Sequence, residues 1–170
     1  AYDNDEAMFD QVHEMRARIM TCDCFDNERV LGAILFEDTM ERAVNGKPTA
    51  NYLWEDKQIV PFLKVDKGLA ERMNGVQIMR PMPNLDLLLD KAKNYPVFGT
   101  KMRSVVYEPS VDGIELVVQQ QFAVAKQILS KGLMPIVEPE VDINSAQKHE
   151  CEQILKTSIL RNLERLNDEH

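Results

Sequence analysis

The sequence predicts an α/β fold in which about four parallel strands alternate with helices. Four short, nearly continuous apolar runs recur along the chain, and such runs are typical of parallel strands covered on both faces. Segments with apolar residues at helical spacing separate them, which implies right-handed crossovers. A doubly wound sheet and part of a (β/α)8 barrel both fit. A complete barrel needs roughly 250 residues, and the 170 residues here would supply about half of one.

The predicted strands are rich in Val, Ile, Leu and Phe, and they span residues 30–36, 59–65, 97–103 and 133–137. Apolar periodicity predicts helices over residues 5–20, 49–57, 85–93, 111–130 and 145–166. Residues 68–83 are predicted to form a loop, because Asn74-Gly75 and Pro81-Met82-Pro83 are turn signals. No composition shift or linker divides the chain, so residues 1–170 are predicted to form a single domain segment.

Charge and hydropathy narrow the class of partner. The net charge of −8 argues against nucleic acid or an anionic membrane surface as a partner. The acidic N-terminus has no apolar core and is no signal peptide, and no apolar run is long enough for a membrane span. The odd cysteine count, with Cys22, Cys24 and Cys151, favours reduced thiols over a disulfide or zinc site. A cytoplasmic protein is expected.

Charged residues gather at the ends of the predicted strands. Residues two apart on a strand share a face, and this spacing relates Lys101 to Arg103 and Glu138 to Glu140. Lys64 lies at the end of the second strand, and Glu37 ends the first. Ligands of parallel α/β folds bind at the carboxyl ends of the strands. Each charge could instead mark a strand leaving the core for solvent.

The interpretation that a charge only marks a strand leaving the core is weakest for Lys101 and Arg103, which interrupt an otherwise apolar run. A lysine in such a place needs a carboxylate or an anionic ligand beside it. Together with Lys64, these cations would attract a phosphorylated or carboxylated ligand, and Glu138 could exchange protons with Lys101. Lysines in a partly desolvated, cation-rich site also form Schiff bases with carbonyl compounds. The residues alone therefore predict an anion site with carbonyl chemistry.

Three short segments of the sequence resemble the motifs of a known family. Residues 62–68 (FLKVDKG), 99–103 (GTKMR) and 135–140 (PIVEPE) resemble the KVDKG, K-x-R and PI[VI]EPE motifs of class I fructose-1,6-bisphosphate aldolases. Residues 32–37 (GAILFE) resemble the second-strand segment of that family. The form is closest to its bacterial branch, and the order and rough spacing of the motifs match over essentially the whole chain.

The resemblance implies a partial (β/α)8 TIM barrel covering strands two to five, with the first strand and strands six to eight absent. It implies a glycolytic lyase that cleaves fructose 1,6-bisphosphate reversibly to dihydroxyacetone phosphate and glyceraldehyde 3-phosphate. The reaction uses a lysine Schiff base, with no metal and no cofactor. That lysine would lie on the sixth strand, outside this chain, so the segment alone is expected to be inactive. The expected partner is a small sugar phosphate, and a homo-oligomer is left open.

The resemblance also assigns roles to individual residues. Glu138 matches the general acid/base of carbinolamine formation and dehydration, and Lys101 the lysine that assists it electrostatically. The residues expected to bind or orient substrate are Lys64, Arg103, Glu140 and Glu37. Two rival interpretations stay open: a non-catalytic half-barrel that binds a phosphosugar, and a different Schiff-base enzyme that uses Lys101 as its nucleophile.

Overall fold

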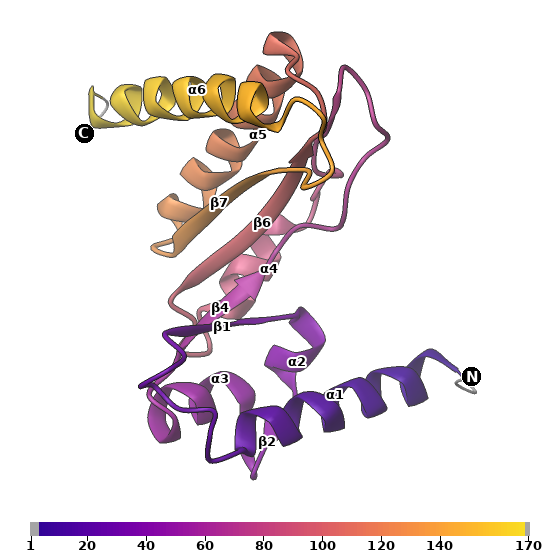
Figure 1. The fold of residues 1–170 in the computed structure, drawn as a ribbon. Helices are drawn as coiled ribbons and strands as arrows, with labels where there is room; N and C mark the ends of the chain where they lie inside the picture. Colours follow the sequence, from indigo (N-terminus) through magenta and orange to yellow (C-terminus); the bar gives the residue numbers. More distant parts are fainter. Residues whose placement is uncertain (1–3, 169–170) are drawn as a thin grey trace. The chain divides into compact units, whose positions relative to one another are not determined.

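A computed structural model describes residues 4–168. The chain forms two compact units, one from residues 1–65 and 86–100 and the other from residues 66–85 and 101–170. The helices and strands of both are labelled in Figure 1. Within the described residues, no helix is both long and apolar enough to cross a membrane.

The first unit is built on two parallel strands, β1 (Gly32–Leu35) and β4 (Val60–Lys64). Their register pairs Gly32 with Val60 and Leu35 with Leu63, which confirms the predicted parallel arrangement. The first strand is shorter than predicted. Phe36 already precedes the helix α2 (Glu37–Glu41), so Glu37 opens a helix and does not end a strand. The sequence pattern missed this because the apolar run continues through Phe36.

Helix α1 (Asp5–Thr21) begins where predicted, because the Asn4 side chain accepts a hydrogen bond from the Ala7 amide at 2.8 Å. The other helices of this unit are α3 (Thr49–Asn51), the π-helix η1 (Tyr52–Asp56) and α4 (Leu85–Ala92). The predicted helix over 49–57 is therefore α-helical only in its first turn. A hairpin of β2 (Ala43–Val44) and β3 (Lys47–Pro48) precedes this segment, and the sequence did not predict it. Asn45 and Gly46 both have positive φ there, as a two-residue hairpin turn of type I′ requires.

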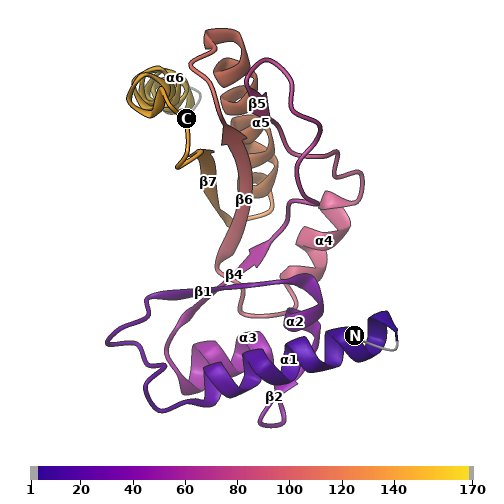
Figure 2. The same cartoon turned by 45° about the vertical axis from the view of Figure 1, so that its right-hand side comes forward.

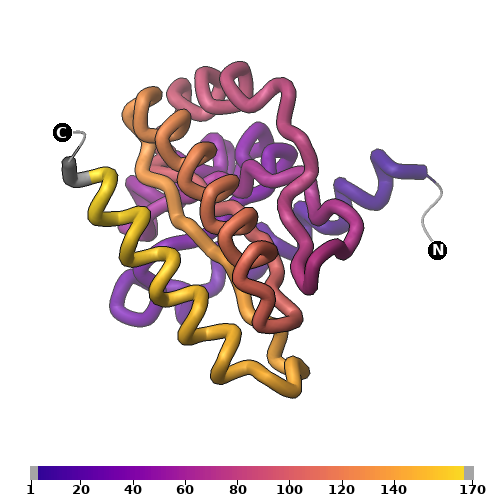
Figure 3. The backbone as a smooth tube through the Cα atoms, turned by 90° about the horizontal axis from the view of Figure 1, so that it is seen from above, coloured from indigo at the N-terminus to yellow at the C-terminus, as the bar shows by residue number. Residues whose placement is uncertain are grey.

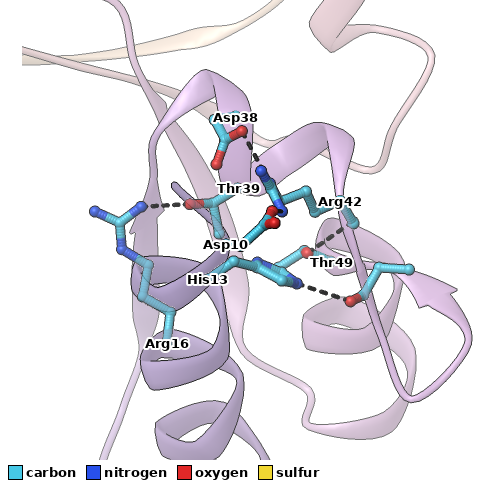
Figure 4. A network of polar contacts seen from close by, with 8 residues as sticks. Asp10, His13, Arg16, Asp38, Thr39, Arg42 and Thr49 are labelled. Carbon is cyan, nitrogen blue, oxygen red and sulfur yellow. Dashed lines mark hydrogen bonds and ion pairs between the residues drawn. The ribbon is translucent and has the colours of Figure 1, made fainter. Parts of the chain in front are cut away.

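Polar contacts hold α1 against α2 and this hairpin (Figure 4). Arg42 forms the centre of the network, with ion pairs to Asp10 at 2.7 Å and Asp38 at 2.9 Å. Arg16 donates to Thr39 Oγ1 at 2.6 Å. His13 Nε2 makes a 2.9 Å hydrogen bond with the Ala43 carbonyl oxygen, which ties α1 to the start of β2.

The second unit centres on β6 (Gly99–Val106), whose first two residues belong to the first unit, and on β7 (Met134–Val141), which pairs with β6. Both strands differ from the predicted 97–103 and 133–137, and both run further toward their carboxyl ends. The predicted ends were placed at charged residues, but in the structure the charges lie within the strands. The predicted loop 68–83 also contains a short strand, β5 (Val76–Gln77), which pairs antiparallel with the end of β6.

Two long helices complete this unit, α5 (Val111–Ser130) and α6 (Lys148–Asp168). They run side by side in Figure 3, Figure 2 looks down the axis of α6, and α5 also packs on β7. The core contains these buried residues: Val76, Val106, Ile114, Val117, Val118, Phe122, Cys151 and Leu155. The apolar periodicity that predicted a helix over residues 111–130 thus marks its buried face, except that Leu129 near the end is 42% exposed.

Candidate functional site

Two ion pairs join β6 to β7 on one face of the second unit. Lys101 Nζ lies 3.1 Å from Glu138 Oε1, and Arg103 Nε lies 2.6 Å from Glu140 Oε2. A step of two residues on β6 matches a step of two residues in the same direction on β7. This pattern is that of neighbouring parallel strands, with α5 as the crossover helix. Lys101 thus has a carboxylate beside it, as expected for a lysine within an apolar run.

The environments of the two pairs differ. The Lys101 side chain is only 14% exposed and Glu138 is 36% exposed, whereas Arg103 and Glu140 are each 44% exposed. A solvated pair such as Arg103–Glu140 contributes about 0–1 kcal/mol to stability. Its geometry is that of an ion pair and not of a hydrogen bond, since Arg103 Nε has no hydrogen-bond acceptor. The ammonium of Lys101 is largely shielded from water, and charge interactions are stronger where water is excluded.

Strand alternation explains why these side chains share a face. Met102 and Ser104, the residues interleaved with Lys101 and Arg103, are fully buried on the opposite side of β6. The strand therefore places its apolar and small residues in contact with the core. Its two cations point away from that core, toward the carboxylates of β7.

A buried glutamine of α5 supports the inner pair, and the sequence analysis missed it. Gln121 Nε2 donates to Ser104 Oγ at 3.0 Å and to the Glu138 carbonyl oxygen at 3.4 Å. One amide group thus contacts both β6 and β7 next to the Lys101–Glu138 pair. The available signal was a polar residue in the middle of the apolar stripe of α5, one turn after Val117 and Val118.

The aspartate of the FLKVDKG string anchors the chain to β6. Asp66 is 7% exposed, and its carboxylate accepts hydrogen bonds from the backbone amides of Arg103 and Gly68, each at 3.2 Å. A buried carboxylate is tolerated when N–H donors satisfy it. The contact fixes the backbone at Arg103, which carries one of the predicted site side chains.

Replacement of Asp66 by alanine is expected to lower the free energy of unfolding by about 1–3 kcal/mol, because two backbone amides lose their acceptor. Asp66→Asn keeps one side-chain oxygen and should cost less. Urea titration followed by circular dichroism measures both. Equal stability of the alanine variant and the wild type would contradict the anchoring role.

The first unit holds the remaining two predicted site residues. Lys64 is the last residue of β4, and its Nζ lies 5.8 Å from the centroid of the Phe36 ring. Glu37, at the start of α2, accepts a hydrogen bond from Lys91 of α4 at 3.0 Å, and Glu41 accepts one from the same ammonium. The hydrogen bonds to Glu41 and then Glu37 raise the pKa of Lys91 far above its usual value. Glu37 is thus engaged in a helix-to-helix contact.

The described residues offer no obvious metal centre. Across residues 4–168, no three side chains of His, Cys, Asp or Glu gather as ligands. What the second unit does gather is a lysine, an arginine and two glutamates: Lys101, Arg103, Glu138 and Glu140. This arrangement can bind an anion through Arg103 and move a proton between Glu138 and a bound molecule.

Comparisons with known proteins agree with the motifs. The family model for glycolytic class I fructose-bisphosphate aldolase matches residues 3–170. A class 1 fructose-bisphosphate aldolase of Synechocystis is 56% identical over 165 residues, which are 97% of this chain and 55% of the relative. The chain therefore spans about half the length of this curated relative.

A solved structure shows the same fold. The fructose-bisphosphate aldolase of Plasmodium falciparum, crystallised with TRAP and a small-molecule inhibitor, superposes with a TM-score of 0.69 at 20% identity, over 95% of this chain and 55% of the other. The α/β fold is accordingly that of a partial (β/α)8 barrel, as predicted. The family match and the Synechocystis relative together confirm the family predicted from the three motifs, and the chain belongs to the class I fructose-bisphosphate aldolases.

Proposed function

We propose that this chain is the central part of an aldolase that cleaves fructose 1,6-bisphosphate reversibly to dihydroxyacetone phosphate and glyceraldehyde 3-phosphate, in cytoplasmic glycolysis. The observation that carries the proposal is the shielded ion pair of Lys101 and Glu138, placed on neighbouring strands by two of the family's motifs. The lysine that forms the Schiff base lies outside residues 1–170. By itself, the segment is inactive, because the covalent step lacks its amine.

Glu138 is the proposed general acid and base. Its carboxylate accepts a proton from the amine as the nitrogen adds to the substrate carbonyl, and it returns that proton to the alkoxide, which gives the carbinolamine. It then accepts the second proton of the nitrogen and donates it to the carbinolamine hydroxyl, which leaves as water as the imine forms. The ammonium of Lys101, 3.1 Å from Glu138 Oε1, stabilises the carboxylate in its ionised form, before it accepts a proton and after it has returned it. It also offers N–H donors to the developing charge on the carbonyl oxygen.

Arg103 is proposed to bind a substrate phosphate, and Lys64 is proposed, by itself, to bind the substrate. A guanidinium has five N–H donors, and Nε of Arg103 lies 2.6 Å from Glu140 Oε2. The terminal nitrogens are left to bind phosphate oxygens in the forked geometry that arginine favours. Glu140 holds the guanidinium in orientation. Glu37 is proposed to contact the substrate from the start of α2.

Borohydride trapping tests this assignment. With dihydroxyacetone phosphate and borohydride, the 170-residue chain should remain unlabelled. The longer protein that contains it should be labelled at a lysine outside this sequence, as peptide mass spectrometry would show. Covalent labelling of Lys101 would mean that Lys101 is the nucleophile and that the proposed roles are wrong. Phosphosugar binding without labelling of either protein would instead indicate a non-catalytic binding module.

A further inference from the structure

Two cysteines lie on one tight turn at the end of α1. The Cys22 amide donates to the Ile19 carbonyl oxygen at 3.2 Å, which ends the helix, and the Phe25 amide donates to the Cys22 carbonyl oxygen at 3.0 Å, which closes a four-residue turn. Lys57 Nζ also donates to the Cys22 carbonyl oxygen, at 2.8 Å. Cys22 and Cys24 are both free and exposed. The turn therefore presents two thiols to solvent on a backbone with several hydrogen bonds.

The two thiols contact each other. A side-chain hydrogen bond from Cys24 lowers the pKa of the Cys22 thiol, with a smaller opposing effect of the Asp23 charge. The same interaction raises the pKa of Cys24, against a smaller lowering effect of Arg29. The thiolate is the reactive form of cysteine. Cys22 is therefore the better nucleophile at neutral pH, and the thiol of Cys24 lies within hydrogen-bonding reach of its sulfur.

Both cysteines line an open hollow of about 460 Å³. It is lined by Met15, Arg18, Ile19, Cys22, Cys24 and Phe25. The apolar side chains can cover the carbon skeleton of a small molecule. Arg18, in the last turn of α1, offers a guanidinium to a carboxylate of that molecule. The hollow suits a peptide-sized thiol compound with acidic groups.

We propose that Cys22 and Cys24 form a reactive dithiol site for small-molecule disulfides of the glutathione type, in which Cys22 attacks and Cys24 resolves. The Cys22 thiolate attacks one sulfur of the disulfide, its S–S bond breaks, and one thiolate leaves. Cys24 then loses its proton to the solvent and attacks the Cys22 sulfur of the mixed disulfide. A Cys22–Cys24 disulfide forms and the second small thiolate leaves, so the two cysteines are oxidised and one small disulfide is reduced to two thiols.

The third cysteine is an internal reference. Cys151 is fully buried in the core of the second unit, and its nearest polar contact is Ser145 Oγ at 3.8 Å. Buried cysteines in apolar surroundings are inert. In the same protein sample, Cys151 should remain unreacted while Cys22 and Cys24 react.

The test incubates the reduced protein with glutathione disulfide near neutral pH, stops the reaction with an alkylating agent and maps each cysteine by mass spectrometry. In the wild type, a disulfide should form between Cys22 and Cys24, seen as a loss of two hydrogens in the mass of the peptide that contains both. Cys24→Ser should stop at one glutathione on Cys22, and Cys22→Ser should stop at one glutathione on Cys24. In the reduced wild type, where both thiols are present, a limiting amount of alkylating agent should modify Cys22 at least about threefold faster than Cys24, because Cys22 is the better nucleophile.

Three results would overturn the proposal. The first is alkylation of Cys24 as fast as that of Cys22 in the reduced wild type, and the second is wild-type protein that carries glutathione on both cysteines. The third is Cys151 reacting as fast as the turn, which would indicate unfolding as the source of reactivity. Both substituted residues are exposed, so the variants are expected to fold, and circular dichroism of each variant checks that they do.

Discussion

Replacing Glu138 by glutamine is expected to lower kcat for fructose 1,6-bisphosphate cleavage by about 10²–10⁴-fold in the longer protein that contains this segment. Glutamine has nearly the shape of glutamate but cannot accept and return a proton. It also leaves the shielded ammonium of Lys101 without its carboxylate, 3.1 Å away in the wild type. Because the lost function belongs to a chemical step, KM should change far less than kcat. Steady-state kinetics measures both constants.

Glu152→Gln is the matched control. Glu152 pairs with Lys148 on α6, and its side chain is about half exposed like that of its partner. The same chemical change at this solvated pair should leave kcat within about twofold, since such pairs contribute little. A comparable fall in both variants would show that loss of negative charge, and not loss of the proton acceptor, causes the effect. An unaltered kcat in Glu138→Gln would remove Glu138 from the proposed mechanism.

Lys101→Met, combined with Glu138→Gln, tests whether the two residues act as a unit. Each single variant should lower kcat, and the double variant should be little worse than the more damaging single one, because each change already disables the pair. Additive losses would mean that Lys101 and Glu138 contribute to separate steps.

The second large effect concerns stability. Gly113→Ala is expected to lower the free energy of unfolding by about 2–3 kcal/mol, although alanine is normally favoured over glycine in a helix by about 1 kcal/mol. Gly113 lies in the first turn of α5. An added Cβ would overlap the carbonyl oxygen of Asn74 and approach Val76 Cγ1 to 3.1 Å. The obstacle is backbone, which cannot rotate away, so α5 would have to move off β5.

Gly132→Ala separates this packing effect from backbone strain. Gly132 follows α5 with φ of +78°, and nothing lies within 4 Å of a Cβ placed on it. Alanine there should cost about 1–2 kcal/mol, from the left-handed conformation alone. Urea unfolding of both variants gives the comparison. A Gly113→Ala protein as stable as wild type would show that the first turn of α5 can shift freely.

Much of the site could be predicted from sequence because strand geometry is local. The alternation of side chains along residues 99–103 was sufficient to place Lys101 and Arg103 on one face, and the structure agrees. The same rule related Glu138 to Glu140. The buried apolar face of α5 could be predicted equally well, because a helix of this length repeats its apolar positions over several turns.

Other features depended on contacts between distant segments. Gln121 contacts β6 and β7 from a position that sequence alone assigns to an apolar face, and the role of Asp66 depends on the backbone of Arg103, far along the chain. The strand β5 has only two residues and exists because the end of β6 pairs with it. Glu37 looked like a strand end because α2 has too few residues to show a helical period.

The sequence by itself determined the family, the alternation of strands and helices, and the residue types that meet at the site, since each of these is written in local strings and periods. Tertiary structure alone decided which partners meet: Lys101 with Glu138, Arg103 with Glu140, and Gln121 with both strands. The physical reason is that a buried charge or amide must find its partner across strands. Spacing along one strand cannot reveal the register with the next.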